Sequence, residues 1–497
     1  MIYHDLRGWI DRLRSEDEIK EVEVEVDWNR EMGAISRRVT STEGPALLFS
    51  NIKDYRKGDF QRLFTGGLGA RRRVAMALDL PKDSSYQEIV KTIKERLRHP
   101  IKPVVLDTGP VKNNIVKGDE IDLYKIPVPQ WHDLDGGRYI DTSCGIVTRD
   151  PDTGGLNIGT YRGMITSKDS IAKLLVATAH WGQHFAKYRE RGEPMPIAIC
   201  YGIEPQLLMC STAALKHGPG ISEYDFAGGL KRNAMELVMC ESVDLLIPAG
   251  AEIVLEGHIS TNPKDFTMEG PFGEYPGTYG GIQSPKPTVK VECMTYRNDP
   301  IYMGNLEGTS PGRWCESPYY VVPTYCALAW NALEDAGVPN VLDVWGDPVS
   351  SGPNNLRVRI KKIYRGHAKQ VALALWGSNL SVYTAKNVIV VDEDMDVHNA
   401  EDIEWAFSYR TNAEMNDIQI FNTCPGSVLD PSVPLREREV MKYGQGKSAR
   451  VLIDATVNWE LDTEDQYGGK RFPPLCTVPE TEDEEMVEKR WNEYGID

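Results

Sequence analysis

The feature that most constrains the fold is a run of short strand-like segments from about residue 118 to residue 310. Within it, Val289, Val291 and Cys293 alternate with charged residues, which is the pattern of a half-buried strand. Residues 196–201 and 243–247 are short apolar runs next to proline or glycine. So many short strands in one stretch favour a β-barrel or a tightly bent sheet.

One helix is expected to interrupt this run. Ile171, Leu174, Leu175 and Thr178 have helical spacing and lead into residues 180–182, His-Trp-Gly. His180 would then lie at the end of that helix.

The parts on either side of this run predict mixed domains of helices and strands. Ser85 and Glu88 form a capping-box pattern before a helix with an apolar face. After residue 318, helical stretches alternate with strands such as 357–360 and 388–391. The fold class is therefore α/β (α+β). We predict an N-terminal α/β domain over 1–117, a central domain over 118–310, a C-terminal α/β domain over 311–458, and an acidic tail over 459–497 with a helix that contacts a neighbouring subunit.

The charge and cysteine content exclude several classes of protein. The 497 residues include 56 Lys and Arg against 73 Asp and Glu, so the net charge of −17 argues against a nucleic-acid binder. Nine scattered cysteines without a C-x-x-C pair indicate free thiols in a reducing compartment. No apolar run approaches the roughly 20 residues of a membrane span, and the first residues lack the pattern of a secretion signal. We expect a cytoplasmic protein without a membrane partner.

Three polar residues in the central stretch could bind a metal ion. Asn157, His180 and Glu223 offer an amide oxygen, an imidazole and a carboxylate, a set that suits Mg²⁺ or Mn²⁺ better than a structural zinc. Each residue alone has an ordinary structural explanation, because a histidine at a helix end is more often a capping or core residue. Only the three together make a metal site credible.

A second cluster contains two carboxylates on one turn. Glu269 and Glu274 are separated by Gly-Pro-Phe-Gly, which must turn and could bring both around a shared partner such as Arg162. A guanidinium between them would keep one ionised and could leave the other with a raised pKa. The alternative is a surface turn with two exposed glutamates.

Other motifs fail. Residues 392–396 resemble the start of a calcium loop, but Val397 replaces the required glycine and Ile403 the required glutamate. The sequence has no G-x-S-x-G elbow, no Walker loop and no dinucleotide-binding G-x-G-x-x-G after a strand.

Taken in order, the motifs resemble the UbiD family of reversible decarboxylases. They are N-I-G-T-Y-R at 157–162, H-W-G at 180–182, S-E-Y-D-F-A-G at 222–228 and E-G-P-F-G-E at 269–274, followed by matches at 386–396, 405–410 and 453–456. The resemblance covers nearly the whole chain. It implies a central split β-barrel that binds prenylated FMN with a divalent metal, usually Mn²⁺, and often K⁺. It also implies a flavin prenyltransferase as the supplier of the cofactor.

The resemblance assigns roles by position. Asn157, His180 and Glu223 would bind the metal. Arg162, Glu269 and Glu274 would form the catalytic network, with Glu274 as the proton donor. The residues expected to contact the cofactor, with Ser211 and Thr212 near its phosphate and K⁺, are Thr160, Tyr161, Arg162, Val176, Ala177, Thr178, Trp181, Gly182, Ser211, Thr212 and Lys386.

The expected reaction is the non-oxidative decarboxylation, with the direction left open, of a hydroxybenzoate-like or heteroaromatic acid to release CO₂. A polyprenyl-hydroxybenzoate decarboxylase of quinone biosynthesis is a rival. A flavin-binding redox protein or a flavin-binding subunit of a larger carboxylase is an alternative from another class. We expect a homodimer or homohexamer.

The sequence departs from related enzymes of cinnamic acids in two places. Residues 210–223 form a slightly longer loop, which obscures the K⁺ ligands. Ala179 and Trp181 flank the metal histidine, where those enzymes have a Gln before it and no Trp after it. Trp181 hints at an aryl substrate, but a packing role is equally compatible. Residues 308–320 match nothing usable, so the substrate stays open.

Overall fold

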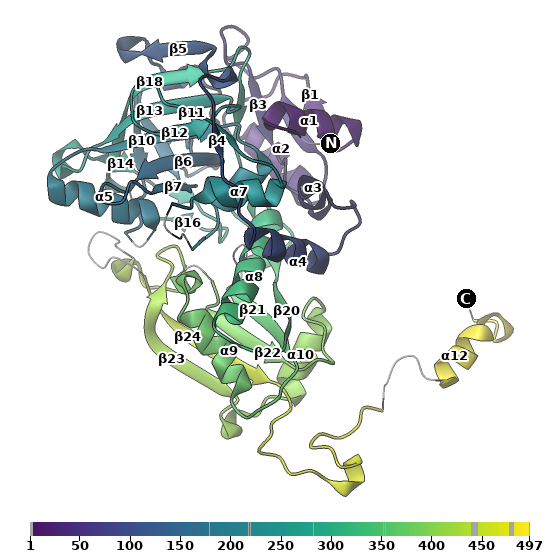
Figure 1. Ribbon diagram of the computed structural model, residues 1–497. Coiled ribbons are helices and arrows are strands. Elements are labelled where there is room, and N and C mark those ends of the chain that lie inside the picture. Colours follow the sequence, from purple (N-terminus) through teal and green to yellow (C-terminus); the bar gives the residue numbers. More distant parts are fainter. Residues whose placement is uncertain are drawn as a thin grey trace.

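A curled sheet of eight strands forms the centre of the protein (Figure 1). The computed structural model describes residues 3–177, 179–216, 218, 220–281, 283–350, 352, 354–382, 384–438, 446–476 and 482–496. The strand order is β7-β6-β10-β13-β18-β9-β8, and β5 pairs with β18. The strands are β5 (Asn114–Lys117), β6 (Cys144–Arg149), β7 (Leu156–Gly159), β8 (Gly163–Ser167), β9 (Ser170–Lys173), β10 (Met195–Tyr201), β13 (Ile253–Ile259) and β18 (Thr288–Tyr296). The bent sheet predicted from the strand pattern is confirmed.

The bend of this sheet has a local cause in β13. The pairing of β13 with β18 shifts register between Glu256 and Gly257, which marks a β-bulge or similar irregularity. A Cβ at Gly257 would lie 2.0 Å from the carbonyl oxygen of Lys290, so only glycine allows the two strands to approach this closely. Bulges bend a strand and increase its twist. The alternating residues Val289, Val291 and Cys293 are buried, as predicted.

Further short elements surround this sheet. A small sheet has the order β12-β11-β4, and two hairpins pair β14 with β17 and β15 with β16. These strands are β4 (Val104–Val105), β11 (Glu236–Met239), β12 (Leu246–Pro248), β14 (Thr267–Glu269), β15 (Phe272–Gly273), β16 (Tyr279–Gly280) and β17 (Ser284–Lys286). The helices of this region are α5 (His180–Arg191), α6 (Pro205–Ser211) and α7 (Glu223–Lys231).

A four-stranded sheet with the order β1-β2-β3-β19 forms the N-terminal part. Its strands are β1 (Ile19–Val22), β2 (Ala46–Phe49), β3 (Arg62–Thr65) and β19 (Ile301–Met303), and its helices are α1 (Leu6–Ser15), α2 (Glu31–Thr40), α3 (Arg71–Ala77) and α4 (Tyr86–Leu97). The capping box predicted at Ser85 and Glu88 is present at the start of α4. Because β19 comes from much later in the chain, the N-terminal sheet is closed by residues that follow the central sheet.

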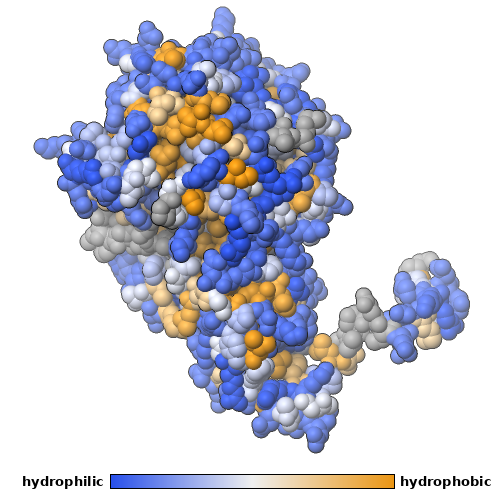
Figure 2. All heavy atoms as spheres, viewed as in Figure 1, coloured by the Kyte–Doolittle hydropathy of each residue, from blue (hydrophilic) through white to orange (hydrophobic). Residues whose placement is uncertain are grey.

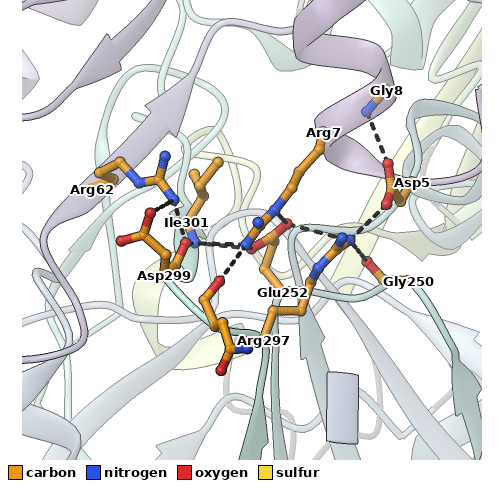
Figure 3. Close-up of polar contacts among 10 residues, drawn as sticks. Asp5, Arg7, Gly8, Arg62, Gly250, Glu252, Arg297, Asp299 and Ile301 are labelled. Atoms are coloured by element: carbon orange, nitrogen blue, oxygen red, sulfur yellow. Dashed lines mark hydrogen bonds and ion pairs between the residues drawn. The ribbon is translucent and has the colours of Figure 1, made fainter. Parts of the chain in front are cut away.

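An ion cluster attaches α1 to the central sheet (Figure 3). Arg7 donates to both oxygens of Glu252, over 2.8 and 2.9 Å, and Glu252 is fully buried. Arg297 lies 3.6 Å from Glu252 and donates to Asp5 over 2.6 Å. The backbone N–H of Ile301 donates to the second Glu252 oxygen over 3.0 Å. This Glu252 cluster therefore joins α1, β13 and the segment that leads into β19.

The C-terminal part contains a five-stranded sheet with the order β20-β21-β22-β24-β23. Its elements are β20 (Val341–Gly346), β21 (Asn355–Ile360), β22 (Asn387–Val391), β23 (Ile418–Gly426), β24 (Gly446–Ala455), α8 (Ser317–Asp335), α9 (His367–Trp376) and α10 (Ala400–Tyr409). The long helix α8 packs on both α4 and β20, and it extends from the upper part of the molecule to this lower sheet (Figure 1). The strands expected at 357–360 and 388–391 are present within β21 and β22.

The surface shows two further features. The predicted C-terminal helix is α12 (Glu482–Lys489), which lies away from the body of the molecule (Figure 1). Figure 2 shows apolar side chains on the face where β4 and β11 lie, and Val104, Val105 and Met239 are exposed there. All nine cysteines carry free thiols, as predicted. Among the described residues, the helices are all too short or too polar to span a bilayer.

The helix expected from Ile171 to residue 178 is wrong. Ile171 lies in β9, where it pairs with Val289 of β18, and the helix α5 begins only at His180. His180 therefore starts a helix and does not end one. Four apolar residues are too few to distinguish a helical period from a buried strand that is followed by a turn.

Candidate active site

A cavity of about 480 Å³ lies between the central sheet and the C-terminal part. Residues of β7, α5 and α7 line one side, and residues 426–429, at and after the end of β23, line another. Arg162, Phe272, Glu274 and the start of α8 complete the wall. The cavity thus depends on segments that are far apart in the sequence.

The three predicted metal ligands all line this cavity. Asn157 lies on β7, His180 is the first residue of α5, and Glu223 is the first residue of α7. Asn157 and Glu223 are buried, and Glu223 accepts a hydrogen bond from the backbone N–H of Ile158 over 2.8 Å. The sheet and two helix starts therefore bring together residues that lie up to 66 positions apart.

These residues fit a metal-bound phosphate group. The side-chain nitrogen of Asn157 is buried and has no hydrogen-bond partner among the described residues, so this donor is available to an oxygen atom of a bound phosphate. His180 and Glu223 are the first residues of α5 and α7, so two helix N-termini, which favour a bound anion, lie at the cavity wall. Within the described parts of the chain, no three His, Cys, Asp or Glu side chains form a metal cluster. The bound cation stays a prediction, because this set has only two such residues and an amide.

Arg162 is bound between two carboxylates at the cavity wall. Its Nε and Nη2 lie 2.9 and 3.0 Å from the two oxygens of Glu269, and its Nη1 donates to Glu274. Tyr139 donates from its hydroxyl to Glu269 over 2.7 Å, and Phe272 lies against the guanidinium. Glu269 and Glu274 are both buried, so the alternative of a turn with two exposed glutamates is wrong.

Burial sets the proton affinity of these groups. It raises the pKa of Glu274; the charge of Arg162 and its hydrogen bond oppose the rise, and the nearby Glu269 adds to it. Burial lowers the pKa of Arg162, but the two carboxylates outweigh this and hold it above its ordinary value. Glu274 is therefore a buried carboxyl group at the cavity with an increased tendency to hold a proton.

The residues expected to contact the flavin form one side of the wall. Thr160 donates to the carbonyl oxygen of Cys144 over 2.7 Å, and its hydroxyl lies 2.9 Å from that of Ser211. Tyr161 stacks on Trp181 with 4.4 Å between ring centres. The wall includes the predicted residues Asn157, Thr160, Tyr161, Arg162, Val176, His180, Ser211, Thr212, Glu223 and Glu274.

Five other predicted residues lie behind or away from the wall: Ala177, Trp181, Gly182, Glu269 and Lys386. Trp181 is fully buried behind Tyr161, as expected if its role is packing. Gly182 lets α5 approach the preceding segment, because a Cβ there would lie 2.2 Å from the carbonyl oxygen of Val176. Lys386 donates to Asp430 and Ser432 over 2.7 and 2.8 Å. Thr178 lies outside the described residues.

Sequence reasoning missed one side of the cavity. It comprises Glu307, the residues Ser317, Tyr320, Val321 and Tyr325 of α8 or its start, and residues 426–429. Burial raises the pKa of Glu307 to about 7, and the charge of Glu274 contributes to the rise. Glu307 lies in a loop, where no hydrophobic period marks it as important. The only local signal in the sequence is the glycine that follows it, Gly308, which is typical of a turn.

Three family models match the chain. The model of the 3-octaprenyl-4-hydroxybenzoate carboxy-lyase N-terminal domain matches residues 10–93, that of the Rift-related domain matches 102–310, and that of the C-terminal domain matches 319–455. A relative from Pseudomonas aeruginosa named pyrrole-2-carboxylic acid decarboxylase is 30% identical over 99% of this chain and 98% of its own length.

Solved structures agree with these matches. The vanillic acid decarboxylase of Sedimentibacter hydroxybenzoicus in its closed form is 30% identical with a TM-score of 0.86, and the match covers 100% of both chains. The UbiD-class enzyme HmfF from Pelotomaculum thermopropionicum, in complex with FMN, is 30% identical with a TM-score of 0.79 over 98% of this chain and 100% of its own. An evolved dimeric form of HmfF, in complex with prFMN, is 28% identical with a TM-score of 0.78 over 97% and 98%.

The chain belongs to the UbiD family and is a carboxy-lyase. Its solved relatives include a vanillic acid decarboxylase and flavin complexes of a UbiD-class enzyme.

Proposed function

We propose that the protein catalyses the non-oxidative decarboxylation of an aromatic carboxylic acid, hydroxybenzoate-like or heteroaromatic, with Glu274 as the proton donor. The observation that carries this proposal is the buried Arg162, which binds Glu269 and Glu274 at the wall of a cavity. A buried carboxyl group with a raised pKa holds its proton more tightly than a free one does, and it can deliver that proton to a carbon atom.

The residues around Glu274 have different roles in the proposed reaction. Prenylated FMN, when bound, supplies the electron sink that the departure of CO₂ from a ring carbon requires. The bond between the ring and the carboxylate breaks, CO₂ leaves, and Glu274 gives its proton to the same carbon. Glu269 and Tyr139 hold Arg162 in place, and Arg162 fixes the position of Glu274.

The cofactor would be held at the opposite side of the cavity. Asn157, His180 and Glu223 would bind Mn²⁺ or another divalent cation, which would neutralise the flavin phosphate at the starts of α5 and α7. Ser211 and Thr212 would lie near the phosphate and a K⁺ ion. A flavin prenyltransferase would supply the modified cofactor.

The size of the cavity favours a small acid. Pockets for one drug-sized ligand are about 300–1,000 Å³, and here a cavity of about 480 Å³ must hold the flavin and the substrate together. A ring with one carboxylate fits this space better than an acid with a long polyprenyl chain.

The function is tested by turnover of the purified chain. We expect that protein co-expressed with a flavin prenyltransferase and assayed without oxygen releases CO₂ from one or more aryl acids, without NADH. CO₂ release only from a polyprenyl acid would favour the quinone-pathway enzyme, and release only with a second subunit would favour the carboxylase subunit. Protein that carries the modified flavin but releases no CO₂ from any of these acids would refute the proposal.

The metal assignment has its own test. His180→Ala should lose both the bound metal and the flavin, measured by elemental analysis and by absorbance of the purified protein. The matched control is His258→Ala, because His258 is a partly exposed histidine on β13 that lies outside the cavity wall. Full flavin and metal content in His180→Ala would contradict the assignment.

The protein would act as a homodimer or homohexamer. The exposed apolar side chains Val104, Val105 and Met239 support this, because a contiguous apolar face is typical of a protein contact. The acidic tail with α12, which lies away from the body, would contact a neighbouring subunit.

A further inference from the structure

Glu307 is a second carboxyl group in the wall of the cavity, and the reaction described above does not use it. It lies in the loop between β19 and α8 and is only partly buried. Asn305 donates to its Oε1 from Nδ2 over 2.7 Å, and Ser317 donates to the same oxygen over 2.7 Å. No hydrogen bond from another described residue reaches Oε2. One oxygen is therefore fixed by the protein, and the other is available to a ligand.

The backbone places Glu307 beside Glu274. The N–H of Thr309 donates to the carbonyl oxygen of Tyr275 over 3.0 Å, which joins the two loops. Gly308 has φ +92°, and a Cβ at this position would lie 3.2 Å from the carbonyl oxygen of Glu274. The two carboxyl groups thus project into one cavity from neighbouring segments of backbone.

The N-terminal part of the chain supports this loop from behind. Arg37 of α2 donates to the carbonyl oxygen of Glu307 over 2.7 Å and also donates to that of Gly308. Ser41 accepts a hydrogen bond from the N–H of Trp314 over 2.9 Å. A loop fixed at both ends can hold a carboxylate in one orientation, as recognition of a ligand requires.

We propose that Glu307 selects the substrate by accepting, at Oε2, a hydrogen bond from a donor on the aromatic ring, such as a phenolic hydroxyl or a pyrrole N–H. This inference rests on the proposed decarboxylation and names its substrate class: ring acids that carry a hydrogen-bond donor. Glu307 repels the carboxylate of the substrate, so it is the donor-bearing edge of the ring that faces Glu307.

The surroundings of Glu307 agree with this role. Phe272, Tyr320 and Tyr325 line the same cavity and suit a flat ring. Burial and the neighbouring Glu274 raise the pKa of Glu307 to about 7, so an approaching donor stabilises the ionised form. A site built to bind a donor disfavours an analogue without one, because its acceptor is then left unpaired.

Glu307→Gln should reverse the preference. Asn305 and Ser317 both donate to Oε1, so the glutamine carbonyl oxygen must occupy that place and the amide NH₂ must replace Oε2. A group that accepts hydrogen bonds thus becomes one that donates them. The acids are compared in matched pairs: 4-hydroxybenzoate with 4-methoxybenzoate, and pyrrole-2-carboxylate with furan-2-carboxylate. Dissociation constants are measured on protein containing unmodified FMN, and kcat/KM on protein with the prenylated cofactor.

The expected result is that the wild type binds the donor-bearing acid of at least one pair about 10–100-fold more tightly and that Glu307→Gln loses or inverts this preference. Ser317→Ala, which releases one anchor of Oε1, should reduce the preference to a smaller extent. Glu193→Gln, at an exposed glutamate, should keep it. Flavin content and thermal melting report whether each variant is folded.

The two measurements separate this inference from the proposed function. Discrimination in binding without CO₂ release would refute the decarboxylation and leave the role of Glu307 intact. Turnover with the same preference in wild type and Glu307→Gln would refute the role of Glu307 alone. A wild type that fails to bind any donor-bearing acid, or binds both members of each pair equally, would also overturn it.

Discussion

Two buried ion clusters of the central part differ in their ratio of arginines to carboxylates. In the Glu252 cluster, Arg7 and Arg297 face Glu252 and Asp5, so two positive groups balance two negative ones (Figure 3). In the cavity, Arg162 alone faces Glu269 and Glu274, and Glu307 lies nearby. The first cluster is balanced, whereas the second has an excess of carboxylates.

This difference fits the proposed roles, in which the Glu252 cluster stabilises the fold and the Arg162 cluster takes part in the reaction. Hydrogen bonds to Glu252 hold the pKa of Arg7 above its ordinary value, and both carboxylate oxygens of Glu252 are occupied by protein donors. Burial alone would raise the pKa of Asp5, but hydrogen bonds from Arg297 and from the backbone N–H of Gly8 outweigh it and hold that pKa below its ordinary value. Where carboxylates outnumber guanidinium groups, burial favours protonation, and here it raises the pKa of both Glu274 and Glu307.

The largest expected effect is on activity in the unbalanced cluster. Glu274→Gln removes the transferable proton, so kcat should fall by about 10²–10⁴-fold, the usual contribution of a general acid. Flavin binding and thermal stability should stay close to wild type, because an amide still accepts a hydrogen bond from Arg162. CO₂ release under anaerobic conditions measures the loss, and a variant with wild-type turnover would refute the assignment of the proton donor.

A substitution in the balanced cluster should lower the stability of the fold. Glu252→Gln leaves Arg7 and Arg297 without a full counter-charge, so the free energy of unfolding should fall by about 3–5 kcal/mol. Urea unfolding followed by tryptophan fluorescence measures this loss.

The control for this prediction is Glu16→Gln. Glu16 pairs with Lys82 near the surface over 2.9 Å, where water screens the two charges, so its loss should leave the free energy of unfolding nearly unchanged. Equal effects of the two substitutions would mean that the Glu252 cluster does not hold α1 on the central sheet.

The smallest effect concerns the pH dependence of stability. The pKa of Glu307 is raised in the folded state to about 7 from its ordinary value of 4.5, so the folded protein binds a proton more tightly than the unfolded chain. This contribution to stability is complete below about pH 4.5 and is lost as the pH rises through 7. Melting temperatures of Glu307→Gln should therefore exceed those of wild type by more at pH 8 than at pH 5. A constant difference would contradict a raised pKa.

Local signals predicted much of the fold. The capping box at Ser85 and the alternation at Val289 and Val291 depend on residues close in sequence, and both are present in the structure. The helix expected from Ile171 failed because strand pairing with Val289 outweighed a weak helical pattern. A pairing partner more than 100 residues away is invisible to a periodicity argument.

In the candidate site, too, some residues could be predicted from local sequence and others depend on distant contacts. Asn157, His180 and Glu223 could be named from residue types and the order of motifs, and the fold brings them to one cavity. Glu307 could not be named, because its importance depends on α8 and on the loop that carries Glu274. The burial that raises its pKa exists only after three distant segments have packed together.

The contact of Arg37 with the loop at Glu307 limits how such enzymes can be recombined. Among the residues that line the cavity, none precedes Asp141 in the described chain, yet Arg37 and Ser41 hold the backbone of the substrate wall. A chimera that exchanged only the N-terminal domain with that of a relative would keep every lining side chain and still displace Glu307. From the proposed role of Glu307, we expect exchange of this domain to alter substrate preference, and we expect the two segments to change together during divergence.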